Sequence, residues 1–245
     1  MDRHLLLQVP YVPFVARLLS SSHLADAFDT FVILEPPGVS GLPPRDMQAA
    51  SATTSAYPTA AEFADAVVRM ISTTLHGART VDAVGHSYGG MILSYVELYH
   101  PEVLNRVAYL DCPLFFVHTT CFWPILFTPI TYRRIAALLA TGAVREAISL
   151  FVYGELWHQH VIRHCTWLCE YCSREVDMNT GERHLVVLSQ EDTVVDSPAI
   201  AEYLAHHFPR VSTHCIEGWG HGTGIRPFTW TKLVHILEGF FAADA

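Results

Sequence analysis

Residues 85–90 read Gly-His-Ser-Tyr-Gly-Gly, which is the pattern G-x-S-x-G followed by one more glycine. A strand-like run at residues 80–84 precedes the pattern, and a helix-like run at residues 91–99 follows it. A serine between a strand and a helix sits on a sharp turn, and the flanking glycines let the two elements approach closely. The helix N-terminus then offers free N–H groups to an anion that forms beside Ser87. This context favours a nucleophilic Ser87 over a glycine-rich turn without a chemical role.

The length and composition of the chain fit a single α/β domain. Its 245 residues allow a large buried core, and 51% of them are hydrophobic while 16% are charged. The formal net charge of −9 disfavours nucleic acid and anionic lipid as partners. The first residues contain no apolar run long enough for a signal peptide, which favours a cytoplasmic location. The six cysteines are then expected to be thiols rather than a disulfide framework.

Strand-like and helix-like segments alternate along the chain. The predicted strands are residues 31–34, 80–84, 107–110, 185–188 and 211–216, and the predicted helices are residues 11–19, 59–75, 91–99, 197–207 and 228–241. The three leucines at residues 5–7 are too few to decide whether they form a strand. This alternation predicts a mostly parallel sheet covered by helices on both faces, in one domain that spans residues 1–245.

Residues 112–132 contain no Asp, Glu, Lys or Arg. The stretch is long enough to cross a bilayer, but Pro113, Pro124 and Pro129 argue against a membrane-spanning helix. It belongs to a long insertion, residues 113–180, that leaves the sheet at the carboxyl end of a strand. Ligands of open α/β sheets bind at that edge, so we predict that the insertion is a helical cap, or lid, over the site.

Two further motifs supply candidates for a base and an acid. A serine nucleophile needs a base to take its proton, and a carboxylate to fix the tautomer of that base. His221 lies between glycines after the last predicted strand, and Asp192 follows the strand before it, so the chain order predicts a triad of Ser87, Asp192 and His221. Asp111, at the end of an earlier strand, is an alternative acid. Asp196 is another, although it is better explained as the N-cap of the next helix.

These motifs resemble those of the α/β-hydrolase superfamily, AB hydrolase-1 type, from about Tyr11 to Ala245. The matching stretches are GHSYGG, LSQEDTVVD and EGWGHG. The chain is also similar to a eukaryotic group in fungi, plants and protists that combines a YVPF helix, a GHSYG elbow, an LDP-type strand end and a helical cap. The resemblance implies a serine esterase or lipase that needs no cofactor, in which the backbone N–H of Tyr88 helps to form the oxyanion hole.

The start of the chain can be aligned with this family in two ways. The family takes its second oxyanion donor from a His-Gly loop that follows a strand beside the nucleophile strand. If residues 5–7 are that strand, Gln8-Val9-Pro10 replaces the loop, and Pro10 has no N–H to donate. If residues 11–19 are the helix after the loop, the chain is truncated at its start. The YVPF match favours the second alignment, which predicts that one edge of the strand at residues 81–84 lacks a full partner.

The favoured function is hydrolysis of a small lipophilic ester through an acyl-enzyme. The substrate pocket is expected to be lined by aromatic residues of the cap: Phe115, Phe116, Phe122, Trp123 and Phe127. The rival hypothesis is a hydrolase-fold binding protein that keeps the triad residues but lacks a complete oxyanion hole.

A cluster of histidines and cysteines in residues 157–172 offers another interpretation. His160, His164, Cys165, Cys169 and Cys172 follow one another at a spacing that would suit zinc. The same segment carries large apolar residues, and cysteine is common in buried positions, so we favour a buried cap helix and predict no metal.

Overall fold

A computed structural model of the chain describes residues 4–8, 12–34, 60–76, 80–113, 140, 178, 181–193 and 195–242. One compact unit comprises residues 1–34, 60–116 and 174–245, and a second comprises residues 35–59 and 117–173. The predicted cap lies outside the described residues apart from Pro113, Ala140 and Met178. The same holds for the five aromatic residues of the expected pocket and for the cluster at residues 157–172. Within the described part, no helix is long and apolar enough to cross a membrane.

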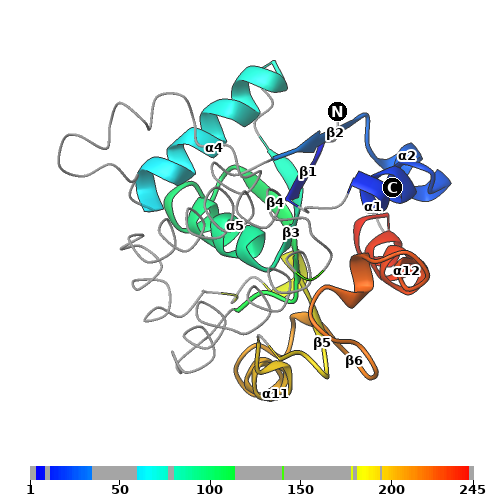
Figure 1. Cartoon of the computed structure of the whole chain (residues 1–245). Coiled ribbons are helices and arrows are strands. Elements are labelled where there is room, and N and C mark those ends of the chain that lie inside the picture. Colours follow the sequence, from blue (N-terminus) through cyan, green and yellow to red (C-terminus); the bar gives the residue numbers. More distant parts are fainter. Residues whose placement is uncertain are drawn as a thin grey trace. The chain divides into compact units, whose positions relative to one another are not determined.

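A six-stranded parallel sheet forms the centre of the first unit (Figure 1). Its strand order is β2-β1-β3-β4-β5-β6. The strands are β1 (His4–Gln8), β2 (Thr30–Ile33), β3 (Val81–His86), β4 (Leu104–Leu110), β5 (His184–Ser189) and β6 (Ser212–Ile216). The predicted parallel sheet is therefore confirmed. Because all strands run the same way, their carboxyl ends meet at one edge, and the loops that follow them share that edge.

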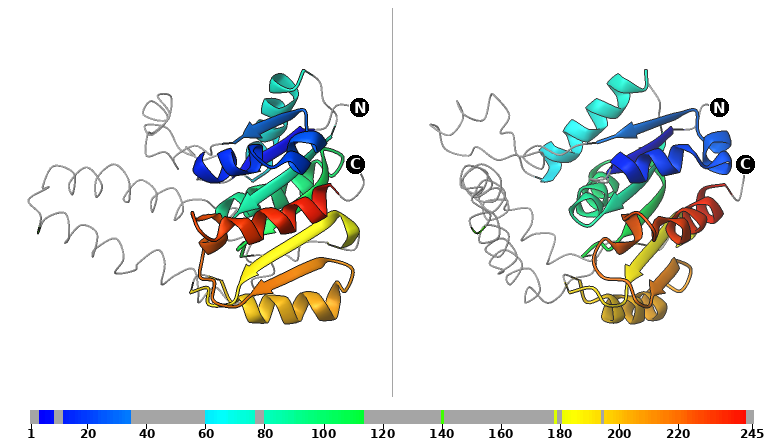
Figure 2. Two further views of the ribbon diagram at one scale, coloured as in Figure 1. Left: turned by 90° about the vertical axis from the view of Figure 1, so that its right-hand side faces the viewer. Right: turned by 45° about the vertical axis from the view of Figure 1, so that its right-hand side comes forward.

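Helices cover both faces of this sheet (Figure 2). The described helices are α1 (Val12–Leu19), α2 (Ser22–Ala27), α4 (Ala60–Thr74), α5 (Tyr88–Tyr99), α11 (Ser197–His207) and α12 (Trp230–Phe241), with 3₁₀ turns η2 (Gly181–Arg183) and η3 (Thr223–Ile225). On one face α12 packs against α1 and α2, and on the other α4 packs against α5. Of these helices only α2 was not predicted, because its six residues bury just Leu24 and Ala27, and two buried positions are too few to establish a helical period.

The first strand corrects the sequence-based alignment of the N-terminal residues. β1 pairs with β2 on one side and with β3 on the other, where Leu5 lies opposite Asp82 and Gln8 opposite Gly85. The expectation that one edge of β3 lacks a full partner is wrong, and so is the alignment that placed α1 after a missing strand. Three leucines were too short a signal, whereas pairing on both sides satisfies the backbone groups of the strand.

The strand after the nucleophile helix is longer than its apolar residues suggested. β4 begins at Leu104 rather than at Val107. Its first residues include two polar ones, Asn105 and Arg106, so the apolar pattern of the sequence did not indicate that the strand starts before Val107. The carboxylate of Asp82 on the neighbouring strand accepts hydrogen bonds from Asn105 Nδ2, at 2.8 Å, and from the backbone N–H of Arg106, at 3.1 Å. These bonds offset the burial of polar groups between the two strands.

Close contact between α5 and the sheet depends on Gly90, in the first turn of this helix. A Cβ atom on Gly90 would lie 1.9 Å from the Sγ of Cys112, just beyond β4. The Cys112 thiol is fully buried and donates to the carbonyl oxygens of Gly85 and Leu110, at 3.3 and 3.2 Å. Burial raises the pKa of this thiol. Cys112 is therefore an inert packing residue, and it occupies the space that a side chain at position 90 would need.

We expect Gly90→Ala to destabilise the protein by about 1–3 kcal/mol, because the added methyl group overlaps a buried sulfur atom. Adding Cys112→Gly should recover part of that loss. Gly239→Ala in α12 is the matched control, since a Cβ atom there meets nothing within 4 Å. That control should gain stability, by up to about 1 kcal/mol. Denaturant unfolding measures all three, and equal effects at positions 90 and 239 would contradict the packing argument.

Candidate active site

Ser87 occupies the turn between β3 and α5. Its backbone angles are φ 51° and ψ −119°, a conformation that non-glycine residues rarely adopt. Two backbone hydrogen bonds hold the turn: Ser87 N–H donates to the carbonyl of Leu110 at 2.8 Å, and Gly90 N–H donates to the carbonyl of Ser87 at 3.0 Å. The first bond joins the turn to the end of β4. The strained serine is thus supported by the neighbouring strand.

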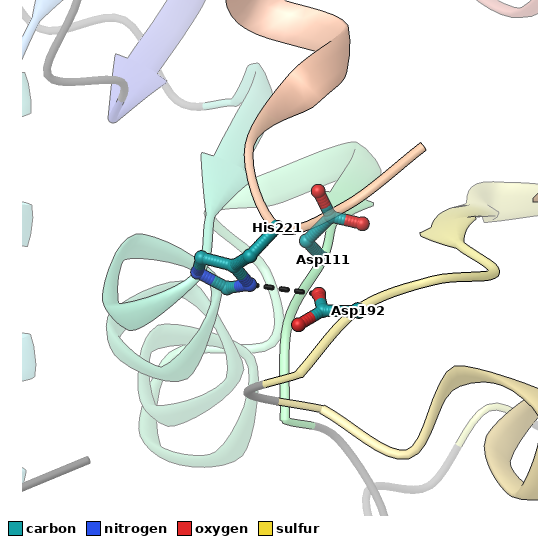
Figure 3. A group of neighbouring side chains, drawn as sticks. All are labelled: Asp111, Asp192 and His221. Atoms are coloured by element: carbon teal, nitrogen blue, oxygen red, sulfur yellow. Dashed lines mark hydrogen bonds and ion pairs between the residues drawn. The ribbon is translucent and has the colours of Figure 1, made fainter. Parts of the chain in front are cut away.

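His221 and Asp192 lie beside this serine, on the loops that follow β6 and β5. His221 Nε2 is 3.0 Å from Ser87 Oγ. On the other side of the ring, His221 Nδ1 is 2.7 Å from Asp192 Oδ2, and Figure 3 marks this bond with a dashed line. The Asp192 side chain is fully buried, and its Oδ1 accepts the backbone N–H of Val195 at 3.1 Å. The structure therefore brings together the three side chains that were predicted as a triad.

The hydrogen-bond partners indicate which nitrogen of His221 carries the proton. An ionised carboxylate can only accept, so Nδ1 of a neutral His221 donates to Asp192. Nε2 then has a free lone pair that faces the hydroxyl of Ser87. In this arrangement the imidazole can take the hydroxyl proton as the oxygen attacks, and the carboxylate can stabilise the resulting imidazolium.

The two alternative acids have other partners. Asp196 accepts the backbone N–H of Ala199 at 3.3 Å and caps α11, as its sequence context indicated. Asp111 Oδ1 accepts Ser189 N–H at 2.8 Å, and its Oδ2 accepts Ser189 Oγ–H at 3.0 Å and Gly222 N–H at 2.8 Å. Burial raises the pKa of Asp111, while the hydrogen bonds from Gly222 and Ser189 act in the opposite direction.

The site also contains a group of side chains of the types that bind metals, namely Asp111, Asp192 and His221. One ligand atom from each lies within 4.8 Å of the other two (Figure 3). A cation would have to replace the bond between His221 and Asp192 and compete with the backbone donors that Asp111 accepts. Because both carboxylates already have hydrogen-bond donors, we interpret the cluster as a hydrogen-bond network.

His86, at the variable position before Ser87, is a site residue that sequence reasoning missed. Its ring centre lies 5.2 Å from that of His221. Its Nε2 is buried and, among the described residues, has no hydrogen-bond partner. Burial, followed by repulsion from His221, lowers the pKa of His86 from 6.5 to about 3, and Asp192 partly opposes this shift. A neutral His86 ring therefore lies beside the imidazole that is expected to become charged.

Of the two expected oxyanion donors, the structure describes the one at Tyr88. Tyr88 is the first residue of α5, so its backbone N–H belongs to the N-terminal turn, where donors lack partners within the helix. The second donor is expected in the segment after β1, and residues 9–11 lie outside the described part of the chain.

His86 should make the stability of the protein depend on pH. The unfolded chain binds a proton at this residue below about pH 6.5, whereas the folded protein does so only near pH 3. The free energy of unfolding should therefore fall as the pH falls through this window, by up to about 1.4 kcal/mol per pH unit. His86→Gln should make that fall shallower. Denaturant unfolding between about pH 6.5 and about pH 4 measures the slopes, and parallel curves for the two proteins would contradict the buried neutral imidazole.

Comparison with known proteins identifies the family of the chain. Residues 10–232 match the alpha/beta hydrolase family. A meta-cleavage product hydrolase from Pseudomonas fluorescens IP01 superposes with a TM-score of 0.67 at 12% identity, over 100% of this chain and 92% of that one. An esterase from Thermogutta terrifontis superposes with a TM-score of 0.63 at 12% identity, over 99% and 90%. An esterase from Exiguobacterium antarcticum reaches 0.58 at 13% identity, over 98% and 92%. No curated protein matches the sequence significantly.

Proposed function

Because this chain belongs to the alpha/beta hydrolase family, we propose that it is a serine hydrolase that cleaves a small lipophilic ester through an acyl-enzyme. The observation that carries this proposal is the continuous line of hydrogen bonds from Asp192 to His221 and on to Ser87, at 2.7 and 3.0 Å. Its three members come from loops that follow three different strands. Such an arrangement supplies nucleophile, base and orienting acid without further movement of the chain.

The reaction proceeds in two half-reactions. Ser87 Oγ attacks the carbonyl carbon of the ester while its proton passes to His221 Nε2. The tetrahedral intermediate then expels the alcohol, which takes that proton, and leaves the acyl group on Ser87. Water attacks the acyl-enzyme while His221 takes one of its protons, and that proton passes to Ser87 Oγ as the carboxylic acid leaves. Asp192 faces Nδ1 of His221 throughout and stabilises the imidazolium in both half-reactions.

The oxyanion of the intermediate is stabilised from the side of α5. The backbone N–H of Tyr88 directly follows the nucleophile and lies at the positive end of the helix dipole. One such donor typically contributes about 100- to 1000-fold to kcat. The sequence feature that supports a lipophilic substrate is the uncharged stretch at residues 112–132, which contains the five aromatic residues expected to line the pocket.

The first test is chemical labelling of the nucleophile. We expect a fluorophosphonate to label the protein at Ser87, and Ser87→Ala and His221→Gln to abolish both labelling and hydrolysis of p-nitrophenyl esters. His221→Gln should change stability by no more than about 1 kcal/mol, since this partly exposed residue is not part of the core. Ser72→Ala, at an exposed serine of α4, is the matched control and should behave as wild type. An unlabelled but folded wild-type protein would instead favour the non-catalytic binding protein.

The second test concerns the acyl group. If the aromatic residues of the insertion line the pocket, kcat/KM should rise along p-nitrophenyl esters from acetate upward. Each added methylene should contribute up to about 0.8 kcal/mol until the pocket is filled. Active-site titration should give the same concentration of reactive Ser87 for each ester. A flat or falling series would leave the hydrolase proposal intact and remove the lipophilic one.

A further inference from the structure

We infer that Asp111 is a positioning residue for the proposed triad: its carboxylate sets the separation between the loop that carries Asp192 and the loop that carries His221. The inference rests on the proposed function. Asp111 bonds to neither His221 nor the hydroxyl of Ser87 in the contacts of its carboxylate described above, so any effect on the reaction passes through other residues.

The first loop is held at its start. Asp111 Oδ1 accepts the backbone N–H of Ser189, and Oδ2 accepts the hydroxyl of the same residue, at 2.8 and 3.0 Å. Ser189 ends β5 and is fully buried. Its carbonyl in turn accepts the backbone N–H of Asp192 at 3.0 Å. The position of the acid is therefore connected to Asp111 through one buried residue.

The second loop is held directly after the base. Asp111 Oδ2 accepts the backbone N–H of Gly222 at 2.8 Å, and Gly222 is adjacent to His221 in the chain. Gly222 has φ +68°, and a Cβ atom there would lie 3.2 Å from the Nε2 of His86. The residue that follows the base thus contacts the carboxylate of Asp111 through its N–H, and a side chain there would be strained by the positive φ and tightly packed against the ring of His86.

The nucleophile is joined to the same strand end. The carbonyl of Leu110, one residue before Asp111, accepts the backbone N–H of Ser87 at 2.8 Å. β4 lies between β3 and β5 in the sheet, so its carboxyl end is next to both the serine turn and the acid loop. Leu110 and Asp111 together therefore contact all three segments that carry the triad.

The chemistry of this position requires a carboxylate. Two backbone N–H groups and one hydroxyl converge on its two oxygens, and only a group that accepts at both ends can satisfy them. An asparagine would turn its NH₂ group toward one of the backbone N–H donors. The site keeps this carboxylate although Asp111 is only 5% exposed and adopts φ 46°. Both features oppose stability, which argues against a role in packing alone.

The test compares Asp111→Asn with a matched control, Asp82→Asn. Asp82 is buried to a similar degree, with 3% exposure against 5%, and it too accepts a backbone N–H, but its partners are Asn105 and Arg106. We expect Asp111→Asn to lower kcat about 10- to 100-fold with KM for p-nitrophenyl esters within about twofold, as for a misplaced catalytic group. Asp82→Asn should lower the melting temperature and leave kcat unchanged.

A second variant, Asp111→Gly, keeps the test decisive if Asp111→Asn does not fold. Glycine adopts φ 46° without strain, so this variant removes the carboxylate and relieves the backbone. Its kcat should fall as in Asp111→Asn, and added formate should restore part of it by occupying the place of the carboxylate. Formate should not activate the wild type or Asp82→Asn.

The outcomes separate the two proposals. If the wild type neither reacts with fluorophosphonate nor hydrolyses esters, the proposed function is wrong and the positioning role falls with it. If the wild type is active and both Asp111 variants retain its kcat, the positioning role alone is overturned. The same conclusion holds if Asp82→Asn loses kcat to the same extent, because loss of stability then explains both. A lower kcat at position 111 alone, with rescue by formate, supports the inference.

Discussion

The hydrogen bond from the backbone N–H of Ser87 to the carbonyl of Leu110, 2.8 Å long, joins the strained turn to the strand beside it. It lies at the end of the parallel pairing of β3 and β4, at the last residue pair, His86–Leu110. A serine at positive φ is unfavourable in isolation, and the neighbouring strand holds it there. The close packing of α5 depends on the same region, because Cys112 occupies the space beside Gly90.

Burial controls the charges around this turn. Desolvation raises the pKa of Asp111 and lowers that of His86, so burial disfavours the charged form of both side chains. The side chain of Asp192 is also fully buried, and the imidazole of His221 is its partner at 2.7 Å. One carboxylate therefore faces the base, while the other faces backbone donors. This division of roles separates the proposed catalytic acid from the carboxylate that holds the loops.

The sequence predicted most of the fold because long periodic segments dominate it. Helix α11 was predicted with the bounds that the structure shows, and the buried strands β3 and β5 were found because parallel strands have continuous apolar runs. The short elements were harder. β1 contributes three apolar residues and α2 buries two, so neither repeats often enough for a pattern to emerge. Their place is set by pairing and packing with residues far away in the chain.

The sequence alone predicted Ser87, Asp192 and His221 as a triad in this chain order. It could do so because a glycine-flanked serine and a glycine-flanked histidine, each after a strand, are local signals. The sequence favoured Asp192 and kept Asp111 as an alternative acid, and only the tertiary structure shows which of the two contacts the base. Both follow strands, and the difference lies in which one reaches Nδ1 of His221 and which one reaches Gly222 N–H. Only the tertiary structure also identifies His86 as a site residue. No sequence motif marks it, and its neutral state comes from burial beside His221. Distances between side chains from different strands depend on the register of the sheet, which local sequence does not specify.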